Sequence, residues 1–168
     1  IDVANFYCHD PALADNPPQP HPAPDKPYWL QRPIMNRTRP ETLAFVARFR
    51  ALLDRYPGTM AVAEIAAEDQ IGTMVAYTDG PDRYHTAYSF TLLREAFGAA
   101  IIRGALETMH ARSPCAWPSW AFSNHDVARV VSRWHAEGEA PRAFAKMLIA
   151  CLLCLRGCGG QRLGGVTA

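Results

Sequence analysis

Hydrophobic positions in the first third of the chain follow a helical spacing. Between residues 41 and 56, apolar side chains recur every three or four positions, and Pro57 and Gly58 end the run. The positions with this spacing are Leu43, Val46, Phe49, Leu53 and Tyr56. The pattern predicts an amphipathic helix, and Thr38 and Glu41 have the spacing of a capping box that opens it.

Three other segments have the composition of short strands. Residues 59–64 are apolar up to a terminal glutamate, which is typical of a strand buried on both faces of a parallel sheet. Residues 84–90 are rich in aromatic side chains and form the next predicted strand. Residues 117–126 begin with apolar and aromatic residues and end in Ser-Asn-His-Asp, the kind of polar end at which a parallel strand would present chemistry.

Helical patterns separate these strands. We expect a short helical or looped segment at 69–75, a long helix at 92–112, a shorter one from 130 to near 138, and an apolar helix from Pro141 to Gly157. Strands that alternate with helices favour an α/β fold built from βα units around a parallel sheet.

A proline-rich loop lies between residues 10 and 40, which hold nine of the fourteen prolines. A structureless loop of this length inside a compact domain is uncommon unless it is functional, and the alternative is an interdomain linker. Its apolar residues Tyr28, Trp29, Ile34 and Met35 favour a loop anchored to the domain, because a solvated linker would not need them.

Composition and charge narrow the classes of partner. An apolar fraction of 49% supports a real core over most of the chain. The formal net charge of +1 gives no field that would attract nucleic acid or an anionic membrane, so we expect neither as a partner. A neutral substrate fits this balance better, and no apolar run is long enough for a membrane span.

The five cysteines form no regular disulfide framework, so we expect reduced thiols and a cytoplasmic location. Cys151, Cys154 and Cys158 lie in or next to the apolar helix near the C-terminus. No second ligand pair follows at zinc-site spacing, which favours core packing over metal binding. The chain begins with Ile1 instead of Met, so the lack of a leader sequence says little about location.

Several polar residues allow a structural and a functional interpretation. A carboxylate at Glu64 costs free energy at the end of a buried strand unless it is paired or used, although it could turn outward to solvent. His125 and Asp126 could cap a helix, the interpretation that composition alone favours. His85 could belong to a site or be a hydrogen-bonded core histidine.

Three short segments together resemble a known family. Residues 1–5 (Ile-Asp-Val-Ala-Asn), residues 62–65 (Val-Ala-Glu-Ile) and residues 123–126 (Ser-Asn-His-Asp) are similar, in this order, to conserved regions of the alpha-amylase superfamily, glycoside hydrolase family 13. The phrases at 9–13 and 83–90 look like its bacterial alpha-glucosidase branch.

The resemblance implies a (β/α)₈ TIM barrel, of which residues 1–157 would supply the C-terminal half, from the end of strand 4 through helix 7. The first conserved region, the Gly-Glu-Glu motif and the C-terminal β domain of the family have no counterpart here. Residues 158–168 look like an aberrant tail. We therefore expect a fragment of a larger enzyme.

The resemblance also implies a chemistry. Asp2 would be the nucleophile, Glu64 the general acid and base, and Asp126 a stabiliser of positive charge, in a retaining alpha-glucosidase or transglucosidase. His125 would bind the same sugar of a short substrate such as maltose or sucrose. The candidate sugar-facing aromatics, each of which could equally serve core packing, are Phe6, Tyr7, Phe90 and Trp120.

No organic cofactor is expected, and calcium is implied only by analogy with the family, without a ligand that can be named. The alternative function is an inactive barrel fragment that serves as a binding or structural piece, whose open strand edges would favour pairing with another chain.

Overall fold

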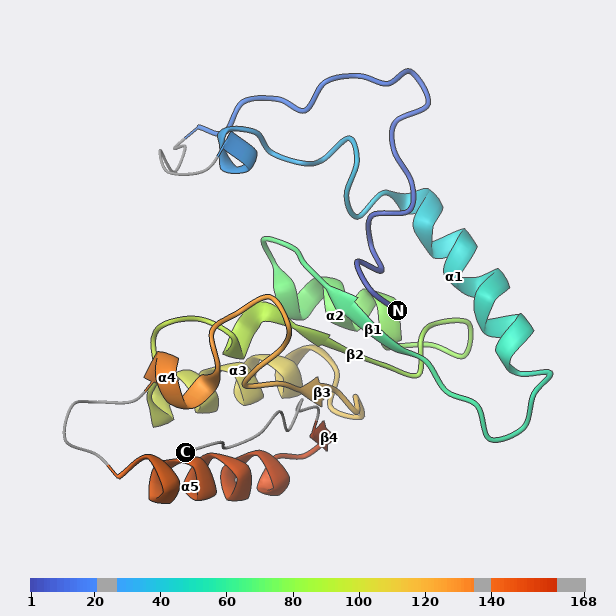
Figure 1. Cartoon of the computed structure of the whole chain (residues 1–168). Helices are drawn as coiled ribbons and strands as arrows, with labels where there is room; N and C mark the ends of the chain where they lie inside the picture. Colours follow the sequence, from blue (N-terminus) through green and yellow to red (C-terminus); the bar gives the residue numbers. More distant parts are fainter. Residues whose placement is uncertain (21–26, 135–139, 160–168) are drawn as a thin grey trace.

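The computed structural model describes residues 1–20, 27–134 and 140–159, and strands alternate with helices along it (Figure 1). The elements in chain order are the 3-10 helix η1 (Pro27–Leu30), α1 (Pro40–Leu53), β1 (Val62–Ile65), α2 (Gln70–Thr78), β2 (Thr86–Ser89), the 3-10 helix η2 (Phe90–Leu92), α3 (Ala99–Arg112), β3 (Ser119–Trp120), α4 (Val130–Trp134), α5 (Pro141–Cys154) and β4 (Cys158–Gly159).

The strands pair in parallel. β1 pairs with β2, with Glu64 opposite Tyr88, and β3 pairs with β4. The Thr86 hydroxyl donates to the carbonyl of Trp117 at 2.8 Å and so joins β2 to the segment that leads into β3. On the other edge of β1, the Ile1 nitrogen donates to the Val62 carbonyl at 2.9 Å, and the Ile1 carbonyl accepts from the Glu64 amide at 2.9 Å. The predicted alternation of helices with parallel strands is confirmed, but within the described residues the strands form two separate two-stranded sheets, β1–β2 and β3–β4, in place of one continuous sheet.

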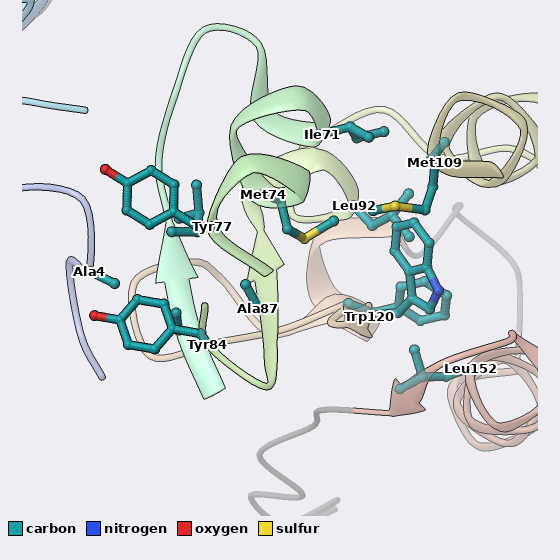
Figure 2. Packing of buried hydrophobic residues seen from close by; sticks show 14 of the residues in the cluster. Ala4, Ile71, Met74, Tyr77, Tyr84, Ala87, Leu92, Met109, Trp120 and Leu152 are labelled. Atoms are coloured by element: carbon teal, nitrogen blue, oxygen red, sulfur yellow. The ribbon is translucent and has the colours of Figure 1, made fainter. Parts of the chain in front are cut away.

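The core lies between these strands and the helices that connect them. Figure 2 shows it extending from Tyr77 and Tyr84 at one end to Trp120 and Leu152 at the other. The predicted amphipathic helix contributes Val46, which is fully buried, to the same cluster. Because the strands are short, helix side chains supply much of this core, which fixes the strand ends in place.

The predicted capping box is wrong. Arg39 is the N-cap of α1, and no side chain hydrogen-bonds there to the free backbone amides. Thr38 instead adopts a left-handed backbone conformation, φ 56°, and its hydroxyl accepts a hydrogen bond from the Asn5 side chain at 2.8 Å. The tertiary contact with Asn5 therefore takes the hydroxyl that a capping box would use.

Two further elements are shorter than predicted. The strand expected at 117–126 is confined to Ser119–Trp120, and the helix expected at 92–112 begins only at Ala99. The carbonyl of Arg94 accepts hydrogen bonds from Trp134 Nε1 at 2.7 Å and from Arg133 Nε at 3.1 Å. These side chains occupy the carbonyl that an earlier helical turn would need.

Two anchors proposed for the proline-rich loop are not buried, since Trp29 and Ile34 are 45% and 44% exposed. The loop is held by backbone contacts instead, such as the Asp10 amide to the Met35 carbonyl at 2.7 Å. The side chain of Tyr28 lies outside the described part of the structure. In Figure 1 this loop projects away from the strands.

The cysteines on α5 serve packing only in part. Cys151 packs against the core, whereas Cys154 is exposed, so the packing interpretation is wrong for Cys154. The side chain of Cys158 and the whole of residues 160–168 lie outside the described residues. Among the helices of the described ranges, none combines the length and apolarity needed to cross a bilayer.

Candidate active site

Acidic and imidazole side chains from three distant segments meet beside the parallel strands. One ligand atom each of Asp2, Glu64 and His125 lies within 4.8 Å of the other two. The His125 Nε2 atom lies 3.9 Å from an Asp2 oxygen and 3.4 Å from an Asp126 oxygen. Because Asp2 follows the residue paired to β1, Glu64 lies in β1 and His125 follows β3, parallel pairing brings these groups together.

Glu64 is the buried member of this group. Its side chain is 4% exposed, which contradicts the alternative of a glutamate turned outward to solvent. Burial raises the pKa of its carboxyl to about 7, assisted by hydrogen bonding to Asp2 and by the charges of Asp2 and Asp126, while hydrogen bonding from Tyr88 opposes the shift. A carboxyl with this pKa keeps a proton near neutral pH and can donate it.

The other members of the group face solvent. The side chains of Asp2, His125 and Asp126 are 68%, 51% and 50% exposed. One side of the cluster is therefore buried, and the opposite side, which carries Asp2, His125 and Asp126, is open to solvent.

The cluster does not suit calcium. Calcium prefers six to eight oxygen ligands in proteins. Asp2 and Glu64 offer carboxylate oxygens, but the third member is an imidazole nitrogen. The expectation of calcium by family analogy finds no support at these residues.

In the loop after β3, one residue caps a helix and other residues belong to the cluster. The Ser123 hydroxyl accepts from the Val130 amide at 2.9 Å, at the start of α4. The Asn124 Oδ1 atom accepts from the Asp126 amide at 3.0 Å and holds a tight turn. Ser123 thus acts as the cap, while His125 and Asp126 reach the cluster.

Asn5 holds the segment that carries Asp2. It is fully buried, and its Nδ2 atom donates to the Thr38 hydroxyl and to the Ala66 carbonyl, both at 2.8 Å. The Ala4 amide also donates to the Glu64 carbonyl at 3.0 Å. Because Ala66 lies two residues beyond Glu64, these bonds fix the chain after Asp2 against the chain after Glu64.

Replacing Asn5 with Ala is expected to lower the free energy of unfolding by about 2–4 kcal/mol, since buried hydrogen bonds are lost and their partners stay buried. Urea denaturation followed by circular dichroism measures the change. Asn36→Ala, which removes an exposed amide group from the loop, should cost less than about 0.5 kcal/mol. Equal costs for both variants would contradict the role of Asn5.

The four candidate sugar-facing aromatics lie in different surroundings. The Tyr7 hydroxyl donates to the Asp2 carbonyl at 3.1 Å, and its ring is exposed beside the cluster. Phe6 is partly buried, with the Arg37 guanidinium 6.0 Å from its ring centroid. Trp120 is a core residue whose Nε1 atom donates to the Arg156 carbonyl at 2.9 Å, and Phe90 is a partly buried residue of η2.

His85 is not part of the cluster, because its Nδ1 atom accepts a hydrogen bond from the Ala61 amide at 3.2 Å. The interpretation as a structural histidine fits this contact. Two residues that the sequence did not single out do lie at the site, namely Tyr88, which hydrogen-bonds to Glu64, and Asn124. The available signal for Tyr88 was its place at the end of a strand next to the one that bears Glu64.

Comparison with known proteins identifies the family of this chain. Residues 1–160 match the family described as alpha amylase, catalytic domain. A probable alpha-glucosidase of Rhizobium meliloti (strain 1021) is 40% identical over 168 residues, which cover 94% of this chain and 30% of the relative. An alpha-glucosidase of Apis mellifera is 27% identical over 139 residues, or 82% of this chain and 24% of the relative.

Solved structures give the same result. An alpha-glucosyl transfer enzyme superimposes with a TM-score of 0.85 and 43% identity, covering 94% of this chain and 30% of that enzyme. A trehalose-6-phosphate hydrolase of Bacillus licheniformis, with a TM-score of 0.70 and 19% identity over 94% of this chain and 29% of its own, shares the fold. The chain thus spans about 30% of the length of its relatives. On the match of residues 1–160, the chain belongs to the alpha-amylase family of catalytic domains.

Proposed function

We propose that this chain supplies the catalytic carboxyl groups of a retaining alpha-glucosidase that hydrolyses or transfers glucose from short alpha-glucosides such as maltose or sucrose. The observation that carries the proposal is the meeting of Asp2, Glu64 and Asp126, with Glu64 buried and the pKa of its carboxyl raised to about 7. The names of the relatives, a probable alpha-glucosidase and an alpha-glucosyl transfer enzyme, support this class of substrate.

In the first step, an Asp2 oxygen attacks the anomeric carbon of the glucosyl unit and the glycosidic C–O bond breaks. Glu64 gives its proton to the departing oxygen, so the leaving group departs as a neutral alcohol. Asp126 stabilises the positive charge that develops on the sugar ring, and His125 hydrogen-bonds to a sugar hydroxyl. The product is a glucosyl ester on Asp2.

In the second step, Glu64 is a carboxylate and removes a proton from water or from a sugar hydroxyl. The resulting oxygen nucleophile attacks the anomeric carbon, and the bond to Asp2 breaks. Two inversions restore the α configuration. The choice between water and sugar decides between hydrolysis and transfer, and the exposed side of the cluster admits either acceptor.

The proposal includes a place in the barrel. Residues 1–157 would run from the end of strand 4 through helix 7, which is supported by the series of contacts from Ile1 to β1, from β1 to β2, and from Thr86 of β2 to Trp117 just before β3. β4 extends this series by pairing Cys158 and Gly159 with β3, at the border of the segment predicted to be an aberrant tail.

The thiols of Cys8, Cys115, Cys151 and Cys154 are free, which supports the proposed cytoplasmic location.

Proton NMR of the full-length enzyme acting on 4-nitrophenyl α-glucoside tests the proposal. We expect α-glucose to appear first and β-glucose to follow only by mutarotation, because two displacements retain the configuration. Initial release of β-glucose would contradict the retaining mechanism. A lack of turnover by the full-length enzyme would favour the inactive binding or structural alternative.

A further inference from the structure

Tyr88 forms part of the buried surroundings of Glu64. The two residues are direct partners in the parallel pairing of β1 and β2, so their side chains project from the same face of the sheet. The Tyr88 hydroxyl lies within reach of the Glu64 carboxyl, whose pKa it lowers by hydrogen bonding, and Tyr88 is only partly exposed. The contact therefore follows from strand register, without any flexible loop.

Asn124 approaches the other side of the same hydroxyl. Its Oδ1 atom is engaged by the Asp126 amide at 3.0 Å. Its Nδ2 atom is buried and lies near the Tyr88 oxygen, yet it makes no hydrogen bond of full geometry within the described residues. Tyr88 thus stands between the buried acid on β1 and the turn that carries Asp126.

The surroundings of Glu64 shift the pKa of its carboxyl in opposite directions. Burial, Asp2 and Asp126 raise the pKa of Glu64, and hydrogen bonding from Tyr88 lowers it. Burial and the nearby Glu64 also raise the pKa of the Tyr88 phenol above its ordinary value. The phenol therefore stays neutral and remains a hydrogen-bond donor over the pH range in which Glu64 titrates.

We propose that Tyr88 is a positioning residue, whose hydroxyl orients the Glu64 carboxyl and couples it to the Asn124–Asp126 turn. A carboxyl has two oxygens, and a donor that holds one of them leaves the other to face the substrate. The kinetic consequences rest on the function proposed above. The effect on the titration of Glu64 does not, because it depends only on the contact.

Tyr88→Phe tests the proposal by removing the hydroxyl while keeping the ring. Carbon-13 NMR of the full chain with labelled glutamate carboxyls, assigned with Glu64→Gln, should show the pKa of Glu64 rising by roughly 0.5–1 unit, because a bond to the charged form is lost. In the full-length enzyme, the high-pH limb of kcat/KM, which falls as Glu64 loses its proton near pH 7, should move upward by the same amount. We expect kcat to fall about 10-fold with little change in KM.

Tyr84→Phe is the matched control. Tyr84 precedes the same strand and is buried, and its hydroxyl has no hydrogen-bond partner among the described residues. The control should leave both the Glu64 titration and the pH profile unchanged. An unchanged Glu64 titration in Tyr88→Phe would overturn the positioning role, whether or not the enzyme is active. An inactive wild-type enzyme with a shifted titration in Tyr88→Phe would instead contradict the proposed function and leave the contact established.

Discussion

Glu64→Gln is expected to lower kcat/KM of the full-length enzyme by about 10²- to 10⁴-fold on alpha-glucosides with poor leaving groups, the usual worth of a positioned acid or base. Glutamine has nearly the shape of glutamic acid but cannot give a proton to the departing oxygen or take one from water. The buried position of Glu64 keeps bulk water from replacing it efficiently. Release of glucose from maltose measures the loss.

The chemistry of the leaving group separates loss of the acid from general damage to the site. A 2,4-dinitrophenyl leaving group departs without protonation, so the first step should be largely retained in Glu64→Gln and a burst of dinitrophenol should precede slow turnover. Glu68→Gln, an exposed glutamate four residues further along the chain that pairs with Arg32, is the matched control and should keep full activity. Equal losses with both classes of substrate would contradict the assignment of Glu64 as the acid.

The same variant should not be less stable than the wild type at neutral pH. The folded state raises the pKa of Glu64, so ionisation of Glu64 costs folding free energy as the pH rises from the ordinary glutamate pKa through about 7. Glutamine avoids this cost, which amounts to about 3 kcal/mol once ionisation is complete. A marked loss of stability at pH 7.5 would indicate that the activity was lost through misfolding.

The helices with strong apolar periodicity could be predicted from sequence because local spacing decides them. α1 and α5 lie close to their expected bounds. α3 does not, since the hydrogen bonds from Trp134 and Arg133 to the Arg94 carbonyl come from residues about forty positions away. A local pattern contains no information about such a contact.

The third strand shows a similar limit. Its sequence is apolar as far as Phe122, but pairing is confined to two residues. Pro118 cannot donate a backbone hydrogen bond at one side, and the Ser123 and Asn124 side chains turn the chain at the other. Composition predicted burial correctly for residues 118–122, but Trp117 is exposed and the strand is shorter than predicted.

The candidate site was predictable to the extent that its residues lie within short family motifs. Tyr88 was not, because its relevance depends on the register that places it opposite Glu64. Asn5 was quoted as part of a motif, but its bonds to Thr38 and Ala66 connect positions 33 and 61 residues away. Residues that position a site through long-range bonds require the three-dimensional structure.

Asp2→Gly is expected to have the largest effect of all, a loss of roughly 10⁴- to 10⁶-fold in kcat, as for other enzymes that lose a covalent nucleophile. No glucosyl ester can form without the carboxylate. The fold should persist, because the Asp2 side chain is 68% exposed and the neighbouring pairing with β1 uses the backbone of Ile1 and Ala4. Asp15→Gly, in the exposed part of the loop, serves as the control and should remain active.

Azide should partly restore turnover of an activated substrate by Asp2→Gly, and the product identifies the residue it replaces. The anion fits the space left by the carboxylate and attacks the anomeric carbon from the face of the sugar ring that Asp2 would attack. An N–C bond forms while the glycosidic C–O bond breaks, and Glu64 supplies any proton that the leaving group needs. A single displacement inverts the anomeric carbon, so NMR should show β-glucosyl azide. An α-azide, or equal rescue of Glu64→Gln with the same product, would show that Asp2 does not occupy the nucleophile position and that the attacking group must lie elsewhere in the enzyme.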